Sequence, residues 1–181
     1  QVEEINPFDF GERKFDYIIG NPPYMKTEDI VRFTPKEHDI YPQRYVSKNK
    51  QYDKYYLFVE RAYNLLKENG QVGYILPNKF TKIQSACKLR EFITGANPNG
   101  FHALKSFTSF GANQVFKGKT TYTCILVLEK ASHDCFIFED VKKLNEWKLR
   151  KEGCRIYKRP SSLVGSESWN LLTDEQQILF D

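Results

Sequence analysis

The pattern of apolar and polar residues along the first two thirds of the chain alternates between two periods. Runs rich in β-branched and aromatic residues predict strands, and apolar residues that recur every three or four positions predict helices. The predicted strands cover residues 15–19, 71–76, 103–110 and 122–128, and the predicted helices cover 52–67 and 85–94. Because helices link the first three strands, these should be parallel, whereas only a loop joins the last two, which should be antiparallel. We therefore expect an α/β sheet with a terminal antiparallel strand pair.

Two parts of the chain lack such periodicity. Residues 25–51 are polar and mixed and contain two prolines, which predicts a long loop. Beyond a short predicted strand at 135–138, residues 141–160 carry a net charge of +6, which exceeds the +4 of the whole chain. We expect a domain boundary between residues 131 and 160. The basic segment is either a solvated surface or a contact for phosphate groups.

Composition narrows the class of protein. The chain is 40% hydrophobic and weakly basic, which suits a globular domain and permits a nucleic-acid partner without requiring one. The longest apolar runs, such as 124–128, are too short to span a membrane, and no secretory signal opens the chain. Four cysteines without a CxxC pair indicate a reducing compartment, so we expect a cytoplasmic protein. No histidines and cysteines have zinc-site spacing, so we expect no metal site.

The run Asn21-Pro22-Pro23-Tyr24 is the strongest chemical signal in the sequence. It follows the first predicted strand at its carboxyl end, where open α/β sheets bind ligands. Two prolines remove two N–H donors and leave the Asn21 side-chain oxygen and the Pro22 carbonyl as acceptors. Two such acceptors suit a planar –NH2 group, and the Tyr24 ring can stack on an aromatic heterocycle.

The exocyclic amine of adenine fits this pair of acceptors. Its lone pair is delocalised into the ring, so the amine is a poor nucleophile until both hydrogens are held and the nitrogen moves toward tetrahedral geometry. The lone pair then points at an electrophile, and no strong base is required before the attack. The alternative interpretation is that the four residues form only a proline-rich turn.

The segment FDYIIGNPPY, residues 15–24, resembles motif IV of the adenine-N6 DNA methyltransferases. Residues 53–80 resemble the next helix and strand of that family, and residues 115–128 resemble motif VIII and the last strand. The resemblance covers about residues 10–130 and follows the order of the gamma class. It extends in particular to the methyltransferase part of type IIG restriction-modification enzymes, which fuse methylation, target recognition and often cleavage in one chain.

This resemblance implies a fold and a division of the chain. The fold would be the C-terminal half of a Rossmann-like S-adenosylmethionine-dependent methyltransferase sheet. Residues 1–130 would form a partial catalytic domain, and residues 131–181 would form a basic connector and the start of a target-recognition domain.

The resemblance also implies catalytic roles. Asn21 and Pro22 would hold the adenine amine, Pro23 would complete the catalytic motif, and Tyr24 would stack on a base flipped out of double-stranded DNA. Phe116, at the phenylalanine of motif VIII, would contact the base from the other side. The alternative for Phe116 is a core residue at the end of a strand.

Other positions are implied to bind the cofactor or the DNA backbone. Asn21 and Phe58 would border the S-adenosylmethionine site, although Phe58 could equally be a core aromatic residue on a helix. Lys117 and Lys119 would contact the DNA backbone. Methylation would need no metal, and the parent protein would act in the bacterial cytoplasm.

The chain departs from the family pattern in one respect. The family binds its cofactor through a glycine-rich motif I and an acidic residue after the next strand, and neither precedes Phe15. The chain opens at Gln1, and its only methionine is Met25. We therefore expect a piece of a longer protein in which motif I lies outside this chain, and we expect the piece alone to be inactive.

Some alternatives are set aside and others stay open. Gly118-Lys119-Thr120 resembles the end of a P-loop, but Asn113 occupies the earlier glycine position. Glu146-Trp147-Lys148 has the form of a nuclease motif but lies in a lysine-rich stretch. Asn-Pro-Pro-Tyr also occurs in enzymes that methylate RNA or release-factor glutamine. A further alternative is a non-catalytic DNA-binding module, in which the motif survives without a cofactor site upstream. The predicted loop at 25–51 and the basic segment favour a DNA enzyme.

Overall fold

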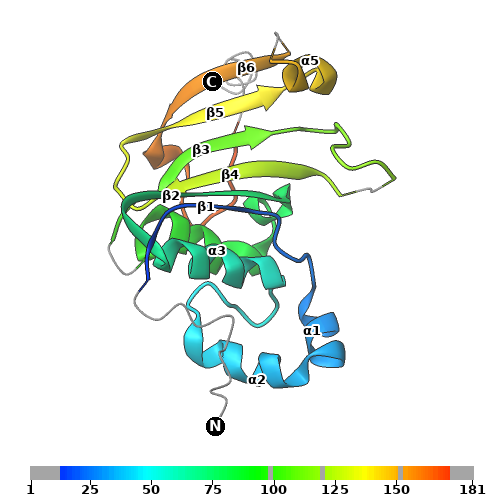
Figure 1. Ribbon diagram of the computed structural model, residues 1–181, viewed down its shortest axis with the longest axis vertical. Coiled ribbons are helices and arrows are strands. Elements are labelled where there is room, and N and C mark those ends of the chain that lie inside the picture. The colour runs from blue at the N-terminus through cyan, green and yellow to red at the C-terminus, as the bar shows by residue number, and fades with distance from the viewer. Residues whose placement is uncertain (1–12, 98–99, 119–120, 151–152, 172–181) are drawn as a thin grey trace.

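A six-stranded sheet in the order β1-β2-β4-β3-β5-β6 organises the molecule in the computed structural model, which describes residues 13–97, 100–118, 121–150 and 153–171 (Figure 1). The strands are β1 (Phe15–Gly20), β2 (Leu66–Pro77), β3 (Leu104–Ser109), β4 (Thr123–Glu129), β5 (Cys135–Val141) and β6 (Cys154–Pro160). The α-helices are α1 (Thr27–Phe33), α2 (Pro35–Arg44), α3 (Lys54–Asn64), α4 (Cys87–Glu91) and α5 (Leu144–Lys148). Short 3₁₀ or π turns form η1 (Asn78–Thr81), η2 (Gln84–Ala86), η3 (Phe92–Ala96) and η4 (Ser161–Leu163).

The strand directions confirm the predicted α/β sheet. β1 and β2 are parallel, and β4 lies antiparallel between β2 and β3. β3 therefore runs in the same direction as β1 and β2, as the sequence predicts. β5 is parallel to β3, and β6 returns antiparallel to β5. The sheet thus continues through the expected boundary at residue 130, and the division of the chain into two domains there stays a prediction.

The segment between β1 and α3 is helical, which corrects the prediction of a long loop over residues 25–51. α1 and α2 occupy much of it. Pro35 is the first residue of α2, a position where a missing N–H group costs nothing because no intrahelical partner exists. The proline was therefore a helix start rather than a sign of irregular chain.

The strand β2 begins five residues before the predicted position. The predicted helix over 52–67 ends earlier than expected, because the ladder of β2 with β1 already starts at the pair Phe15 and Leu66, and Gly70 lies inside β2. A Cβ atom at Gly70 would lie 2.8 Å from the Phe15 carbonyl oxygen, so the close approach of β2 to β1 at this point requires glycine. The helix α3 consequently ends at Asn64.

One face of the sheet is covered by helices and by the last described part of the chain. α3 and α4 pack on it below the strands in Figure 1. The segment of residues 161–171, called the 161–171 segment below, also returns to this face. Its Trp169 is fully buried against Phe80 and Phe107, with ring centroids 5.5 and 6.1 Å apart.

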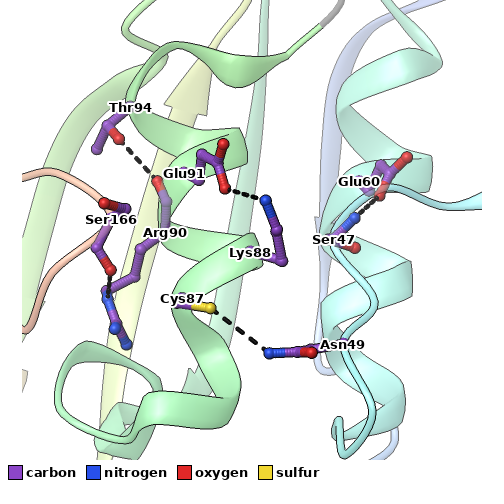
Figure 2. A network of polar contacts seen from close by, with 9 residues as sticks. All are labelled: Ser47, Asn49, Glu60, Cys87, Lys88, Arg90, Glu91, Thr94 and Ser166. Atoms are coloured by element: carbon purple, nitrogen blue, oxygen red, sulfur yellow. Dashed lines mark hydrogen bonds and ion pairs between the residues drawn. The ribbon is translucent and has the colours of Figure 1, made fainter.

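A buried arginine fixes this returning segment. Arg90 of α4 donates hydrogen bonds from Nε to the Ser166 carbonyl and from Nη1 to the carbonyls of Phe80 and Ile83, at 2.7–2.8 Å. Figure 2 shows the contact with Ser166 beside the bond from Asn49 to the Cys87 thiol at the start of α4. Because guanidinium donors satisfy three carbonyls at once, removal of Arg90 would leave buried acceptors unpaired.

The opposite face of the sheet is much more open. Along β2, residues 72, 74 and 76 are buried, and the alternate residues 71, 73 and 75 are only partly buried. Tyr17 and Ile19 of β1 are 71% and 88% exposed on the same side as these partly buried residues. Among the described helices, none is long and apolar enough to cross a membrane.

Candidate active site

Three segments that follow parallel strands lie at one edge of the sheet. Asn21–Tyr24 follows β1, η1 follows β2, and the loop of residues 110–122 follows β3, all toward the right in Figure 1. The backbone N–H of Asn78 in η1 donates to the carbonyl of Tyr122 at the end of that loop, at 3.0 Å. The motif and the loop with Phe116 therefore both lie at the carboxyl ends of the parallel strands, where open α/β sheets bind ligands.

Within the motif, the two acceptor residues, Asn21 and Pro22, differ in exposure, and the Tyr24 ring is fixed by contacts with β2 and α3. Pro22 is buried, whereas Asn21 and Pro23 are exposed. The Tyr24 hydroxyl donates to the Ile75 carbonyl of β2 at 2.9 Å, and its ring meets Tyr55 edge to face with centroids 6.0 Å apart. Within the described part of the chain, no hydrogen bond engages the Asn21 carboxamide, so its oxygen is available to a ligand.

Tyr24 acts as a neutral group. Burial and, to a lesser extent, the neighbouring Cys124 raise the pKa of Tyr24 to about 12. The phenol therefore keeps its proton at any physiological pH and cannot serve as a general base. Its contribution is an oriented ring that is 37% exposed, together with the hydrogen bond that fixes it to β2.

The chain after the motif is pinned to the start of α3. The backbone N–H of Lys54 donates to the Met25 carbonyl at 2.7 Å, and Lys26 forms an isolated antiparallel bridge with Asp53. The Thr27 hydroxyl donates to the Tyr52 carbonyl and accepts from the Tyr52 N–H, at 2.8 and 2.7 Å. These contacts limit how far Asn21–Tyr24 can move relative to the helix.

An ion pair joins the start of α3 to η1. The Lys79 ammonium lies 2.7 Å from the carboxylate of Asp53, whose side chain is buried. Sequence analysis missed this pair, because Asp53 and Lys79 are 26 positions apart and nothing local links them. Their only sequence signal was that both lie in segments that resemble the methyltransferase family.

Phe58 lies on the open side of α3. It is 39% exposed and lines a cavity of about 740 Å³ together with Phe15 and Tyr17 of β1 and Arg61 of α3. It is therefore not a buried core residue. Its exposure and its cavity support the cofactor role that the sequence resemblance implies, which stays a prediction.

The loop after β3 holds the remaining predicted residues. Phe116 is half-buried and Lys117 is exposed, whereas Lys119 lies outside the described residues. Within the described chain, Phe116 makes no ring contact with Tyr24, so contact with a base from two sides stays a prediction. No group of three or more candidate metal ligands occurs among the described residues.

The cofactor expected from the sequence fits these residues in part. The aromatic residues Phe15 and Tyr74 also line the cavity beside Phe58, which suits a flat heterocycle such as the adenine of S-adenosylmethionine. Of the predicted cofactor residues, the structure places Phe58 at this cavity, whereas Asn21 does not line it.

Comparison with known proteins agrees with this fold and motif. The family described as the Eco57I restriction-modification methylase matches residues 1–116. The chain is 47% identical over 179 residues to the type II restriction enzyme and methyltransferase RM.Eco57I of Escherichia coli; the match covers 98% of this chain but 17% of that protein. It is also 34% identical over 121 residues to the type II methyltransferase M.BstVI of Geobacillus stearothermophilus, covering 67% of this chain and 20% of that protein.

Solved structures confirm the predicted methyltransferase fold. The type IIG restriction endonuclease BpuSI matches with a TM-score of 0.59 at 18% identity, over 81% of this chain and 19% of that chain. A putative class I S-adenosylmethionine-dependent methyltransferase from Listeria monocytogenes matches with a TM-score of 0.55 at 15% identity, over 76% of this chain and 40% of that one. The family match over residues 1–116 and the near-complete alignment with RM.Eco57I agree, and the chain belongs to the Eco57I restriction-modification methylase family.

Proposed function

We propose that this chain carries the base-binding half of a DNA methyltransferase that transfers a methyl group to adenine N6, within a longer bacterial restriction-modification protein of the cytoplasm. The observation that carries the proposal is the placement of Asn21–Tyr24. The motif follows a parallel strand at the sheet edge, with the Asn21 carboxamide exposed and the Tyr24 ring fixed beside it. The family membership supports DNA as the substrate.

In the proposed reaction, the side-chain oxygen of Asn21 and the carbonyl of Pro22 accept the two hydrogens of the adenine amine. This draws the amine nitrogen toward tetrahedral geometry and frees its lone pair. Pro22 is buried and conformationally restricted, so its carbonyl would need little reorganisation on binding. The amine acquires positive charge as the new bond forms and loses its proton afterwards.

Tyr24 positions the base by stacking. Its hydroxyl is bonded to Ile75 and one edge of its ring is packed on Tyr55, so the exposed part of the ring is held at a fixed orientation. Because the adenine amine is paired inside a duplex, the base must leave the stack to reach this ring. Phe116 would close the base pocket from the loop after β3.

The methyl donor would be S-adenosylmethionine, which supplies an electrophilic methyl group on a sulfonium centre. Phe58 would border its adenine from α3, and Asn21 would lie between the base and the donor. We propose that the groups that grip the rest of the donor belong to other parts of the parent protein, since this chain spans 17% of RM.Eco57I. The 181 residues alone would then be inactive.

The test uses the full-length parent protein with labelled S-adenosylmethionine and, in separate reactions, duplex DNA, RNA or a release-factor peptide. We expect N6-methyladenine in DNA, identified by mass spectrometry of the digested product. Asn21→Ala should lower the rate at saturating substrate by roughly 10²–10³-fold, in line with the loss of one group that stabilises a transition state. Gln43→Ala, which removes an exposed carboxamide from α2, is the matched control and should keep the wild-type rate.

Other products would separate the alternatives. Methylation of RNA or of a glutamine amide would keep the role of Asn21 and reject DNA as the substrate. DNA binding without methylation of any substrate, in a folded protein, would reject the enzyme and favour a non-catalytic DNA-binding module.

A further inference from the structure

The basic segment of the sequence is divided between two edges of the sheet. β5 runs parallel to β3 and ends at the catalytic edge, and α5 follows it there (Figure 1). β6 then returns antiparallel, so Lys158 pairs with Ile137 and Arg159 with Phe136, toward the opposite edge. Lys158 is four residues along β6 from the turn, which is roughly 13 Å at the usual rise of a strand. Basic residues that lie close together within residues 141–160 are therefore found at opposite ends of the strands.

The basic residues at the catalytic edge, which is the edge that carries Asn21–Tyr24, are Lys142, Lys143, Lys148 and Arg150. We call this group the α5 corner. All four side chains are exposed. Lys142 and Lys143 pair with Asp140 and Glu146 at 2.6 and 3.1 Å, yet both remain more than half exposed. Within the described residues, Lys148 and Arg150 have no acidic partner, and both side chains are exposed.

Of the acidic groups near the corner, Asp140 and Glu139 point inward, whereas Glu146 is 42% exposed and pairs with Lys143. Asp140 is only 13% exposed, and the carboxylate of Glu139 accepts hydrogen bonds from the Trp147 indole and the Thr108 hydroxyl, both at 2.8 Å. Lys148 and Arg150 are thus more exposed than Glu139 and Asp140. An anion that approaches from solvent would meet the ammonium and guanidinium groups first.

The corner is rigidly attached to the loop that carries Phe116 and Lys117. The Trp147 ring packs edge to face on Phe110, where that loop begins, with centroids 5.1 Å apart. The Asn113 side chain within the loop donates to the Val141 carbonyl at the end of β5, at 3.0 Å. The corner therefore keeps a defined position relative to the catalytic edge, as a contact for a long substrate would require.

We propose that the α5 corner binds the phosphate backbone of duplex DNA, at a point beyond the base that enters the catalytic site. The proposal rests on DNA being the substrate and adds a named contact surface to it. Backbone contacts fix the register of a protein on DNA without reading its sequence. Lys148 and Arg150 would each neutralise one phosphate, and the exposed Lys117 continues the same edge toward the motif.

The test measures how the affinity of the full-length protein for a mixed-sequence 40-base-pair duplex depends on salt, by fluorescence anisotropy. Each neutralised phosphate contributes a slope of about −0.9 in a plot of log affinity against log salt concentration. The variant Lys148→Gln/Arg150→Gln should therefore lower the magnitude of the slope by about 1.8 and weaken binding at low salt. Its methylation rate at saturating DNA should stay at the wild-type value, since neither residue touches the reacting groups.

The control variant Lys158→Gln/Arg159→Gln removes the same charge from the other end of the hairpin and should leave the slope unchanged. An equal loss in both variants would overturn the proposal in favour of a general charge effect. An unchanged slope in both would also overturn it, because neither pair would then neutralise a phosphate. If the first variant fails to fold, the single variants Lys148→Gln and Arg150→Gln replace it, each with an expected change in slope of about 0.9. A duplex that binds with the predicted slopes but is never methylated would sustain this inference and reject the proposed function.

Discussion

On the face of the sheet that carries Phe107 and Leu126, side chains are almost fully buried beneath α3, α4 and the 161–171 segment. On the other face, Tyr17 and Ile19 remain 71% and 88% exposed. Sheets built from parallel strands are normally covered on both faces. The comparison indicates that this chain covers one face of the sheet with its own helices and its own 161–171 segment. We propose that other parts of the parent protein cover the second face.

The largest effect is expected on the covered face, from Trp169→Ala. The side chain is 1% exposed and fills the space between Phe80 and Phe107, so truncation leaves a cavity. We expect the free energy of unfolding to fall by about 3–5 kcal/mol. Urea denaturation followed by circular dichroism measures this value. A loss below about 1 kcal/mol would contradict the view that the 161–171 segment belongs to the core.

A smaller and context-dependent effect is expected on the open face, from Ile19→Ala. In the 181-residue chain this side chain buries little surface, so the free energy of unfolding should change by less than about 0.5 kcal/mol. In the full-length protein the same change should cost about 1–3 kcal/mol if the face is covered there. Equal values in the two proteins would show that the face stays open, and the contrast between the faces would then be intrinsic to the fold.

The smallest effect concerns acid pH on the covered side. Burial lowers the pKa of His102 below its usual 6.5, because the charged imidazolium is poorly solvated there. The unfolded chain therefore binds a proton at a higher pH than the folded one, and stability is lost as the pH falls below about 6.5. The urea midpoint should decrease between pH 7 and pH 5.5, and His102→Gln should flatten this dependence. A dependence that persists in the variant would assign it to another group.

The motif and the sheet around it could be predicted from the sequence because both depend on local signals. A β-rich run that ends in Asn-Pro-Pro-Tyr locates a strand end and its acceptors without any tertiary information. The helices α1 and α2 could not be predicted, because their stretch is polar overall and its prolines imitate those of a loop. In α2, Pro35 marks a helix start, which only the surrounding backbone reveals.

Long-range contacts were also beyond the sequence. The Asp53–Lys79 pair and the bond from Tyr24 to Ile75 join segments whose separation in the chain carries no periodic signal. The basic run was visible as a charge count, but its division between two edges follows from the antiparallel return of β6. Pairing geometry, and not residue type, decides which of those charges face the catalytic edge.

The position of Trp169 also has a consequence for engineering this family by exchange of modules. A junction placed at residue 130 or at residue 160 would remove a side chain that fills the core beneath η1, with its backbone N–H bonded to Thr81 at 2.8 Å. A chimera joined there would be expected to lose stability, because the space that Trp169 fills beside Phe80 and Phe107 would be empty. A junction after Leu171 retains the whole 161–171 segment when new downstream sequence is fused to this chain.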